Sequence, residues 1–260
     1  TATELVTPTG NITTGATIGF TDADLNDTHT VTSANALAAV NQPGGLAALG
    51  TVTANVTTDT TNSGTGGVIT WNYSVNASSV EYLAAGETKT ELFDIVLDDN
   101  NSGTGVQARR VEVTLTGTND APTNITTASS LTINELAGAF NTLAVDTTVA
   151  TLATTDVDVT DTHRYTIVGG ADQAFFQIVG NQLQLKGGVT PLNAEVKRTF
   201  VVDVMTEDKQ GTTVLGGSFT KTFTITVNDV DEFDTTAFNL VDVLHVIEQR
   251  WRADDERRGL

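Results

Sequence analysis

Two short turns carry the residues whose types and spacing could bind an ion. Residues 22–29 read Asp-Ala-Asp-Leu-Asn-Asp-Thr-His, and residues 156–163 read Asp-Val-Asp-Val-Thr-Asp-Thr-His. A D-x-D turn supplies two closely spaced carboxylates, and Ca²⁺ takes six to eight oxygen ligands of this kind. A single such turn could equally cap its own backbone with its Asp side chains. Because the turn recurs at matching places, we interpret both copies as parts of calcium sites.

The residues of the same turns exclude an EF-hand loop, and their histidines leave a zinc site as an alternative. Their sixth positions are Asp27 and Asp161, where an EF-hand loop needs Gly, so neither is an EF-hand. His29 and His163 recur with the acids and could be zinc ligands, but no third nitrogen or sulfur ligand accompanies either. We favour the interpretation that each His starts the following strand and packs against the loop.

Composition narrows the possible partners. The chain has 13 Lys and Arg against 32 Asp and Glu, and its net charge of -19 argues against nucleic acid and against anionic membrane surfaces. Without cysteine, neither a disulfide framework nor a thiolate metal site is possible. No apolar run reaches the roughly 18 residues that span a bilayer, so we expect no membrane insertion. The chain opens without a signal peptide, and we expect it to be part of a longer protein.

Alternating apolar residues predict strands throughout most of the chain. In the first half the clearest are 68–75, 91–97 and 110–115. In the second half they are 131–133, 149–152, 164–168, 176–179, 182–185, 199–204 and 221–227. Gly180 and Asn181 predict a hairpin turn. About seven short strands in roughly 110 residues are typical of an immunoglobulin-like antiparallel sandwich. The two turns lie about 134 residues apart, which favours two such units.

We therefore predict an all-β chain of two tandem antiparallel β-sandwiches with a short C-terminal helix. The expected boundaries are 1–120 for the first sandwich, 121–233 for the second and 234–260 for a helical tail. Apolar residues at helical spacing predict the tail helix, which would be either a terminal partner-binding helix or residues foreign to the natural protein. Trp71 and Tyr73 alternate on a predicted strand, where core packing is favoured over a sugar-stacking platform.

Several segments resemble known bacterial modules. In the first unit, residues 79–88, 93–99 and 113–122 resemble the VCBS-type repeat of giant, RTX-type bacterial surface adhesins. The second unit resembles a bacterial cadherin-like domain. Its matching segments are Asn134-Glu135 for the x-E-x motif, Asp156-Val-Asp158 for D-x-D, Leu192-Asn-Ala-Glu195 for L-D-R-E, Glu207-Asp208 for x-D-x and Asp229-Val-Asp-Glu232 for the linker.

The resemblance implies calcium sites at the junctions between modules. The complete junction would contain Glu87, Asn119 and Asp120 from the first module with Asp156, Asp158 and Asp208 from the second, and Glu4 as a weaker candidate. An N-terminal half-site would contain Asp22, Asp24 and Asp99. A C-terminal half-site would contain Glu135, Glu195, Asp229, Asp231 and Glu232. Asn193 and Gly117 stand where the family pattern carries acids, which implies fewer or weaker ions there.

The function that this resemblance implies is mechanical. We expect a non-enzymatic, calcium-rigidified extender module of a secreted or surface-anchored bacterial adhesin, located outside the cell. Its partners would be neighbouring modules of the same chain. One alternative is a module that itself binds a cell-surface carbohydrate or protein, and another is an accessory domain of a secreted polysaccharide-degrading enzyme. No nucleophile elbow or phosphate-binding loop occurs in the sequence.

Overall fold

The computed structural model describes the chain except for residues 6–7, 37–46, 102–104, 137–141 and 231–260. The predicted tail helix, together with Asp231 and Glu232, lies outside the described residues. The described chain forms two antiparallel β-sandwiches, which confirms the predicted all-β class. Among the residues described, no helix is long and apolar enough to cross a membrane.

In its described residues the first sandwich has seven strands in two sheets. One sheet has the order β1-β7-β6-β3 and the other β2-β5-β4. The elements are β1 (Ala2–Thr3), β2 (Asn11–Phe20), β3 (Thr30–Ala36), β4 (Thr51–Thr58), β5 (Gly67–Asn76), the 3-10 turn η1 (Ala77–Ser79), β6 (Thr88–Asp98) and β7 (Gln107–Thr116). Neighbouring strands are antiparallel except for β1, which runs parallel to β7.

The part of the second sandwich that the structure describes has eight strands, in sheets of order β12-β13-β10-β8 and β11-β14-β15-β9. The elements are β8 (Asn124–Thr127), β9 (Thr132–Asn134), β10 (Thr147–Thr155), β11 (Thr162–Gly169), the 3-10 turn η2 (Gln173–Phe175), β12 (Phe176–Val179), β13 (Gln182–Leu185), β14 (Thr199–Gln210) and β15 (Thr213–Asn228). Here β9 runs parallel to β15, as β1 does to β7 in the first sandwich. In each sandwich a short early strand therefore runs parallel to the last strand.

Alternation along the strands explains how each sheet buries one face. On β5 the residues Ile69, Trp71, Tyr73 and Val75 are buried, and their neighbours in sequence are more exposed. Trp71 and Tyr73 belong to the core of the first sandwich, which confirms the core-packing interpretation of these two aromatic residues. A second, separate core fills the other sandwich.

Turn chemistry matches the sequence at two places. Gly180 has φ +62 and connects β12 to β13 through the predicted two-residue hairpin. Asn62 has φ +66 in the turn before β5, in the left-handed region that Asn tolerates better than most residues. Five strands, β1 to β4 and β8, were not among the clearest sequence predictions; β1 has only two residues, and Thr and Gly interrupt the apolar alternation of β2.

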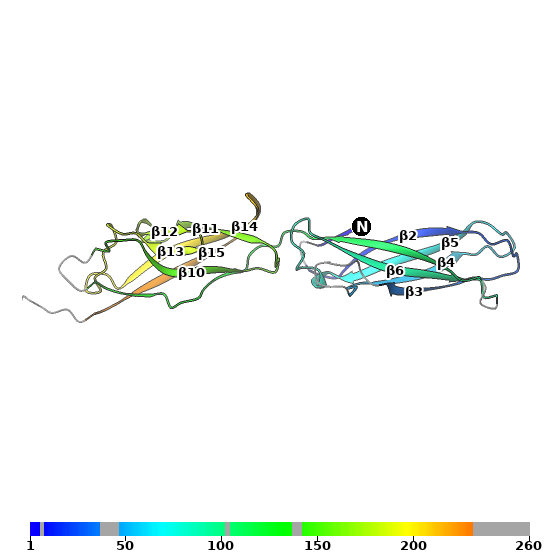
Figure 1. Cartoon of the computed structure of the whole chain (residues 1–260), viewed down its shortest axis with the longest axis horizontal. Coiled ribbons are helices and arrows are strands. Elements are labelled where there is room, and N and C mark those ends of the chain that lie inside the picture. Colours follow the sequence, from blue (N-terminus) through cyan, green and yellow to red (C-terminus); the bar gives the residue numbers. More distant parts are fainter. Residues whose placement is uncertain (6–7, 37–46, 102–104, 137–141, 231–260) are drawn as a thin grey trace, which may run out of the picture.

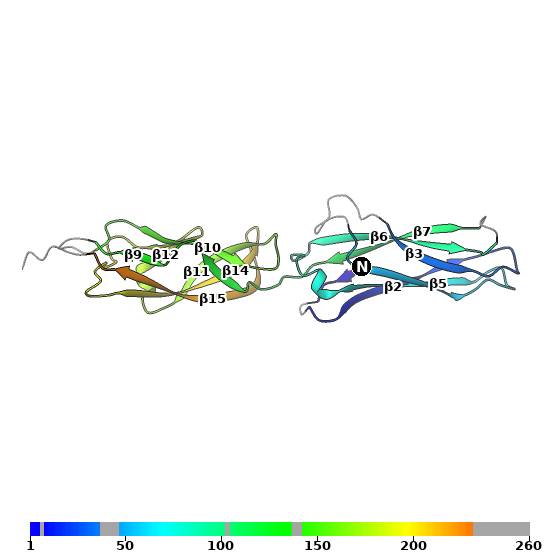
Figure 2. The same ribbon diagram turned by 90° about the horizontal axis from the view of Figure 1, so that it is seen from below.

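The two sandwiches lie end to end, as both side views show (Figures 1 and 2). The connection runs through residues 117–123 between β7 and β8. The β10–β11 loop and the neighbouring parts of β14 and β15 in the second sandwich contact this connection. We call the contact region between the sandwiches the joint, the far end of the first sandwich the tip, and the far end of the second the base.

Candidate metal centre

Hydrogen bonds across the joint place acids of the second sandwich against the connection. The backbone N–H of Asp120 donates to Oδ2 of Asp158 over 2.8 Å. The Asn119 amide donates to Oδ2 of Asp208 over 3.1 Å and to the carbonyl of Gly216 over 3.1 Å. Four of the predicted joint residues are thus brought into direct contact.

The D-x-D turn holds its acids through its own backbone. The N–H of Asp158 donates to Oδ1 of Asp156 over 3.1 Å, and the N–H of Asp161 donates to the Asp158 carbonyl over 3.2 Å. Such Asx turns are the local bonding that Asp residues favour. Asp156 therefore uses one oxygen for its turn, and the other is directed elsewhere.

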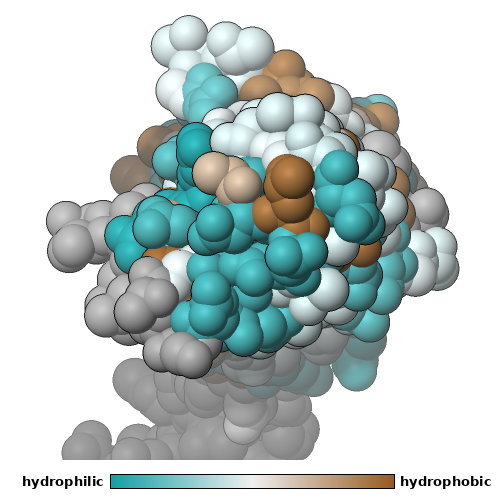
Figure 3. Space-filling model, turned by 90° about the vertical axis from the view of Figure 1, so that its right-hand side faces the viewer, coloured by the Kyte–Doolittle hydropathy of each residue, from teal (hydrophilic) through white to brown (hydrophobic). Residues whose placement is uncertain are grey.

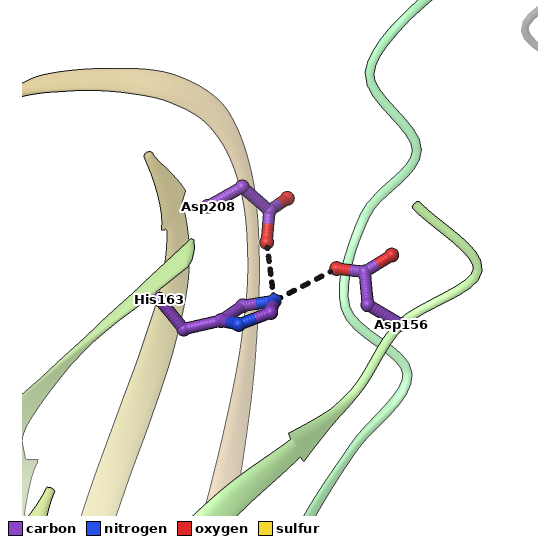
Figure 4. Close-up of side chains that lie close together, drawn as sticks. All are labelled: Asp156, His163 and Asp208. Carbon is purple, nitrogen blue, oxygen red and sulfur yellow. Dashed lines mark hydrogen bonds and ion pairs between the residues drawn. The ribbon is translucent and has the colours of Figure 1, made fainter. Parts of the chain in front are cut away.

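Strand alternation and register explain why Asp208 and His163 meet. On β14 every second residue from Phe200 to Asp208 is buried, so Asp208 takes the last inward position of that strand. His163 on β11 is its direct cross-strand partner. The His163 Nε2 atom lies 3.2 Å from Oδ2 of Asp156 and 3.4 Å from Oδ1 of Asp208, between the two carboxylates (Figure 4).

The first sandwich contributes acids from its own end at the joint. Glu4 follows β1, and its Oε2 accepts the Thr118 N–H over 2.7 Å. Glu81 lies just after η1 and forms a group with Glu4 and Asp120 whose ligand atoms lie within 4.8 Å of one another. Glu87 Oε2 accepts from the Ala84 N–H and from the Thr160 hydroxyl, at 3.2 and 3.3 Å, so it touches the second sandwich.

Buried oxygen atoms without donors gather at the joint. In the described part of the chain, eight buried side-chain oxygens have no hydrogen-bond partner, and seven of them are at the joint. These seven are Glu4 Oε1, Glu81 Oε1, Asn119 Oδ1, Asp120 Oδ2, Asp158 Oδ1, Asp161 Oδ2 and Asp208 Oδ1. Buried polar groups are ordinarily satisfied, and each exception needs a structural or functional reason.

Burial and mutual repulsion raise the pKa of the joint carboxyls. Desolvation raises the pKa of Glu4 and of Asp158 to about 7, against the lowering effect of the backbone N–H groups that each accepts. Burial also raises the pKa of Asp208, where the Asn119 amide opposes the shift and the Asp156 carboxylate adds to it. Burial and the nearby Asp156 charge raise the pKa of Asp120. A positive charge added to such a cluster lowers its electrostatic free energy.

The donor set fits calcium. Six of the seven unpartnered atoms are carboxylate oxygens and the seventh is an amide carbonyl, which are the hard ligands that Ca²⁺ selects. They come from both sandwiches and from the connection between them. The residues that would hold calcium here are Glu4, Glu81, Glu87, Asn119, Asp120, Asp156, Asp158, Asp161 and Asp208.

The tip repeats the turn without a partner module. The Asp24 N–H donates to Oδ1 of Asp22 over 3.0 Å, which is the bond that Asp158 and Asp156 make in the second sandwich. Asp22 and Asp99 come together, but their third companion is Asp27, and Asp24 is exposed outside this group. This end of the molecule is largely hydrophilic in the space-filling view (Figure 3).

His29 is held differently from His163. Its Nδ1 lies 2.7 Å from Oδ1 of Asp59, and its Nε2 lies 3.0 Å from Oδ2 of Asp22. Its ring also contacts Phe20 at a centroid distance of 4.8 Å. Burial acts to raise the pKa of Asp59, but the hydrogen bonds from His29 prevail and lower it. His29 thus packs against the loop, as the sequence predicted.

The base brings together three of its predicted residues, Glu135, Glu195 and Asp229. Glu135 is buried, and its oxygens accept the N–H groups of Ala194 and Val230 at 2.7 and 2.6 Å. These two bonds lower its pKa. Glu195 and Asp229 are exposed. Glu135 therefore already has a structural role in holding two loops.

Packing accounts for one of the two places where the family pattern expects an acid. A Cβ at Gly117 would overlap the carbonyl oxygens of Leu83 and Ala84, so no side chain fits there. The amide oxygen of Asn193 accepts the Val196 N–H over 2.8 Å and caps the turn that contains Glu195. An Asp could accept the same bond, so the Asn at position 193 has no structural explanation.

Sequence reasoning missed four residues of these groups: Asp27, Glu81, Asp161 and His163 as a member of the joint. Asp27 and Asp161 are the third acids of the repeated turns, so the repeat itself carried that signal. Glu81 had no such signal, because only the fold brings the residues after η1 next to Glu4. His163 required the β11–β14 register.

The comparisons with known proteins show only that some solved structures have a similar fold. No protein-family model matches the sequence, and neither does any curated protein. Similar solved structures are cadherin extracellular segments. Mouse cadherin-23 EC22-24 is 20% identical, with 88% of this chain and 62% of that chain covered and a TM-score of 0.45. Human protocadherin-24 EC1-2 is 18% identical, with 78% and 84% covered and a TM-score of 0.41. Human mucin-like protocadherin EC1-2 is 21% identical, with 54% and 69% covered and a TM-score of 0.40.

The chain spans less than two thirds of the cadherin-23 structure. All three TM-scores are below 0.5, so the inferences below rest on the contacts of this chain's own residues.

Proposed function

We propose that this chain is a calcium-rigidified extender segment in which residues 1–120 and 121–233 are two modules joined by a calcium-dependent junction. The observation that carries the proposal is the set of seven buried, unpartnered oxygens at the joint. They converge from two sandwiches, and the ring of His163 lies beside two of the acids, Asp156 and Asp208. A metal-ion junction accounts for both the burial of these acids and their lack of donors.

The chain's own groups determine how such a junction behaves. Without an added cation, the carboxylates of Asp120, Asp156 and Asp158 repel one another: in addition to burial, the Asp156 charge raises the pKa of Asp120, and the charges of Asp120 and Asp156 raise the pKa of Asp158. The direct contacts then holding the joint are a few hydrogen bonds, among them the Asp120 N–H to Asp158 and the Thr160 hydroxyl to Glu87. Bound calcium supplies positive charge that cancels this repulsion. The joint is then stiff with the ion and hinge-like without it.

The expected free energy of binding for each calcium ion is small, so the junction would respond reversibly to the calcium concentration. Extracellular calcium modules bind at about 10⁻⁴ to 10⁻³ M, so at millimolar calcium each ion adds about 1 kcal/mol. Several ions at one joint would together shift it between a flexible and a rigid state. We place such a segment outside the cell, in a bacterial surface or secreted adhesin, where neighbouring modules of the same chain meet its tip and base. The resemblance of its motifs to adhesin repeats supports this assignment.

The proposal is tested by comparing the protein in calcium, in magnesium and in chelator. Calcium should raise the melting temperature and lengthen the molecule in small-angle scattering, and magnesium at equal ionic strength should do so less. If chelation changes neither quantity, the junction proposal is wrong. Glycan binding or self-association by this segment alone would favour a ligand-binding module instead.

A further inference from the structure

The ring of His163 introduces a nitrogen donor into a site otherwise made of oxygens. Its Nε2 atom, Asp156 Oδ2 and Asp208 Oδ1 form a group of possible ligand atoms that all lie within 4.8 Å of one another. Figure 4 shows the ring edge directed between the two carboxylates. Imidazole nitrogen is a preferred ligand of zinc and its neighbours in the first transition series and is foreign to calcium sites.

The separations match those of ligands around one small ion. Zinc lies about 2.0–2.2 Å from nitrogen and carboxylate ligands, so two ligands of a tetrahedral ion lie about 3.3–3.5 Å apart. The Nε2 atom of His163 lies 3.2 Å from the Asp156 oxygen and 3.4 Å from the Asp208 oxygen. Little movement of these three side chains would be needed to accept the ion.

Neighbouring groups already orient both carboxylates. Asp156 uses Oδ1 to accept the Asp158 N–H, and Asp208 uses Oδ2 to accept the Asn119 amide. Each acid therefore presents its other oxygen to His163. Orienting hydrogen bonds of this kind are typical of the residues surrounding metal ligands. Asp208 is fully buried, and its Oδ1 atom has no hydrogen-bond donor.

The other copy of the turn provides a natural contrast. Each ring nitrogen of His29 faces a different carboxylate, Asp59 on one side and Asp22 on the other. No group of metal-ligating atoms within the described residues includes His29. The same sequence motif thus yields a converging donor set at the joint and a bridging histidine at the tip.

We propose that Asp156, His163 and Asp208 bind one divalent transition-metal ion, of the zinc, cobalt or nickel type, through one nitrogen and two oxygens. This site goes beyond the calcium junction and does not depend on it. Because it uses two acids that the junction would also use, an ion bound here competes with calcium at that end of the joint.

Cobalt(II) is the probe, since its absorption spectrum reports nitrogen and oxygen ligands directly. All proteins carry His245→Gln, so that His29 and His163 are the only imidazoles left in the chain. Calcium-free protein is titrated with Co²⁺, and bound Co²⁺ is then displaced with Zn²⁺. His163→Gln should weaken Co²⁺ binding at least about 10-fold, because loss of even an outer-shell partner costs about 10–100-fold. The matched variant His29→Gln should stay within about twofold.

A second measurement needs no variant at these positions. In ¹⁵N NMR of the imidazole rings, sub-stoichiometric Zn²⁺ should shift the Nε2 signal of His163 and leave the ring signals of His29 in place. If His163→Gln binds Co²⁺ as tightly as its parent, or if Zn²⁺ leaves the His163 Nε2 signal in place, the three-residue site is wrong and His163 is only an ion-pair partner of the acids.

The two proposals fail separately. If calcium raises the melting temperature but Co²⁺ binding does not need His163, only the transition-metal site is wrong. If Co²⁺ binding needs His163 but calcium has no effect, only the calcium junction is wrong.

Discussion

The joint and the tip carry the same turn in different surroundings. Both turns make the same bond between the third residue's N–H and the first Asp. At the joint, Asp158 is only 2% exposed, whereas its counterpart Asp24 is exposed at the tip. All the buried carboxylate oxygens without a hydrogen-bond partner among the described residues belong to the joint. The tip's one unpartnered buried atom is the Thr60 hydroxyl.

This difference shows that the turn sequence alone does not make an ion site. A neighbouring module is needed to bury the acids and to add Glu4, Glu81 and Asp120 from the other side. Burial then raises the pKa of the joint acids, so that a nearby cation would stabilise their charged form. At the tip, the carboxylates remain solvated or pair with His29. The tip is a half-site, and another module would have to complete it.

The largest effect is expected from Gly117, which shapes the first sandwich's side of the joint. In Gly117→Ala the new Cβ would collide with the Leu83 and Ala84 carbonyls, so the loop carrying Glu87 must shift. We expect a loss of about 1–3 kcal/mol in the free energy of unfolding. Chemical denaturation measures it. The control Gly19→Ala, whose nearest atom would be 3.9 Å from the Cβ, should change stability little. Equal losses in both variants would contradict this account of residue 117.

The Asp158→Asn variant should change the stability of the calcium-free protein and the stabilisation by calcium in opposite directions. Asn keeps an acceptor for the Asp120 N–H but removes a buried charge whose pKa is raised to about 7. We expect the calcium-free protein to gain about 1 kcal/mol, the order of an unsatisfied buried group. The calcium-induced rise in melting temperature should shrink. Thermal unfolding with and without calcium measures both changes.

The tip variant Asp24→Asn is the matched control for that experiment. Asp24 is exposed at the equivalent position of the other turn, so both quantities should remain as in the parent protein. A similar response of the two variants would remove the distinction between joint and tip.

The pH dependence of the calcium-free protein should also come from the joint. Glu4 and Asp158 have pKa values of about 7 when folded, above the values near 4 that such groups have when unfolded. The folded state then binds more protons than the unfolded state between those values, so stability is greatest at low pH and falls as the pH rises from about 4 to about 7. We expect the melting temperature to drop by several degrees between pH 5 and pH 8, at about 2–4 °C per kcal/mol.

Saturating calcium should reverse or flatten that slope, because the ion competes with protons for the same carboxylates. A calcium-free melting temperature that rises from pH 5 to pH 8 would show that the joint acids do not have raised pKa values.

A small effect is expected from Asp22→Asn at the tip. Asp22 lies 3.0 Å from His29 and keeps its turn-capping bond as Asn. Because Asn replaces only the charge of this side chain, the loss of stability should stay at or below about 1 kcal/mol, the order of one hydrogen bond, and the response to calcium should not change. Differential scanning calorimetry can resolve it. A large loss of the calcium response would mean that the tip, rather than the joint, is the main ion site.

Much of the fold could be predicted from the sequence, because apolar alternation on strands such as β5 and β14 is clear and the Gly180 turn is specific. The strand β2 was less clear because Thr14 and Ala16 interrupt the apolar residues at its alternate positions. In β4 the residues Val52, Ala54 and Val56 alternate with Thr and Asn, so its signal was present in the sequence. The repeated turn indicated the acids of both ends. Glu81 and the pairing of His163 with Asp208 could not be predicted, because they depend on contacts between residues distant in sequence.

The most direct measurement is a crystal structure grown in calcium and soaked with a lanthanide that replaces it, with the ions located by anomalous scattering. The account predicts peaks at the joint, each about 2.3–2.6 Å from oxygens as in calcium sites. Their ligands should include Glu4, Glu81 or Asp120 from one side and Asp158 or Asp208 from the other. Peaks coordinated by the acids of one sandwich alone, or a joint without any peak, would contradict it.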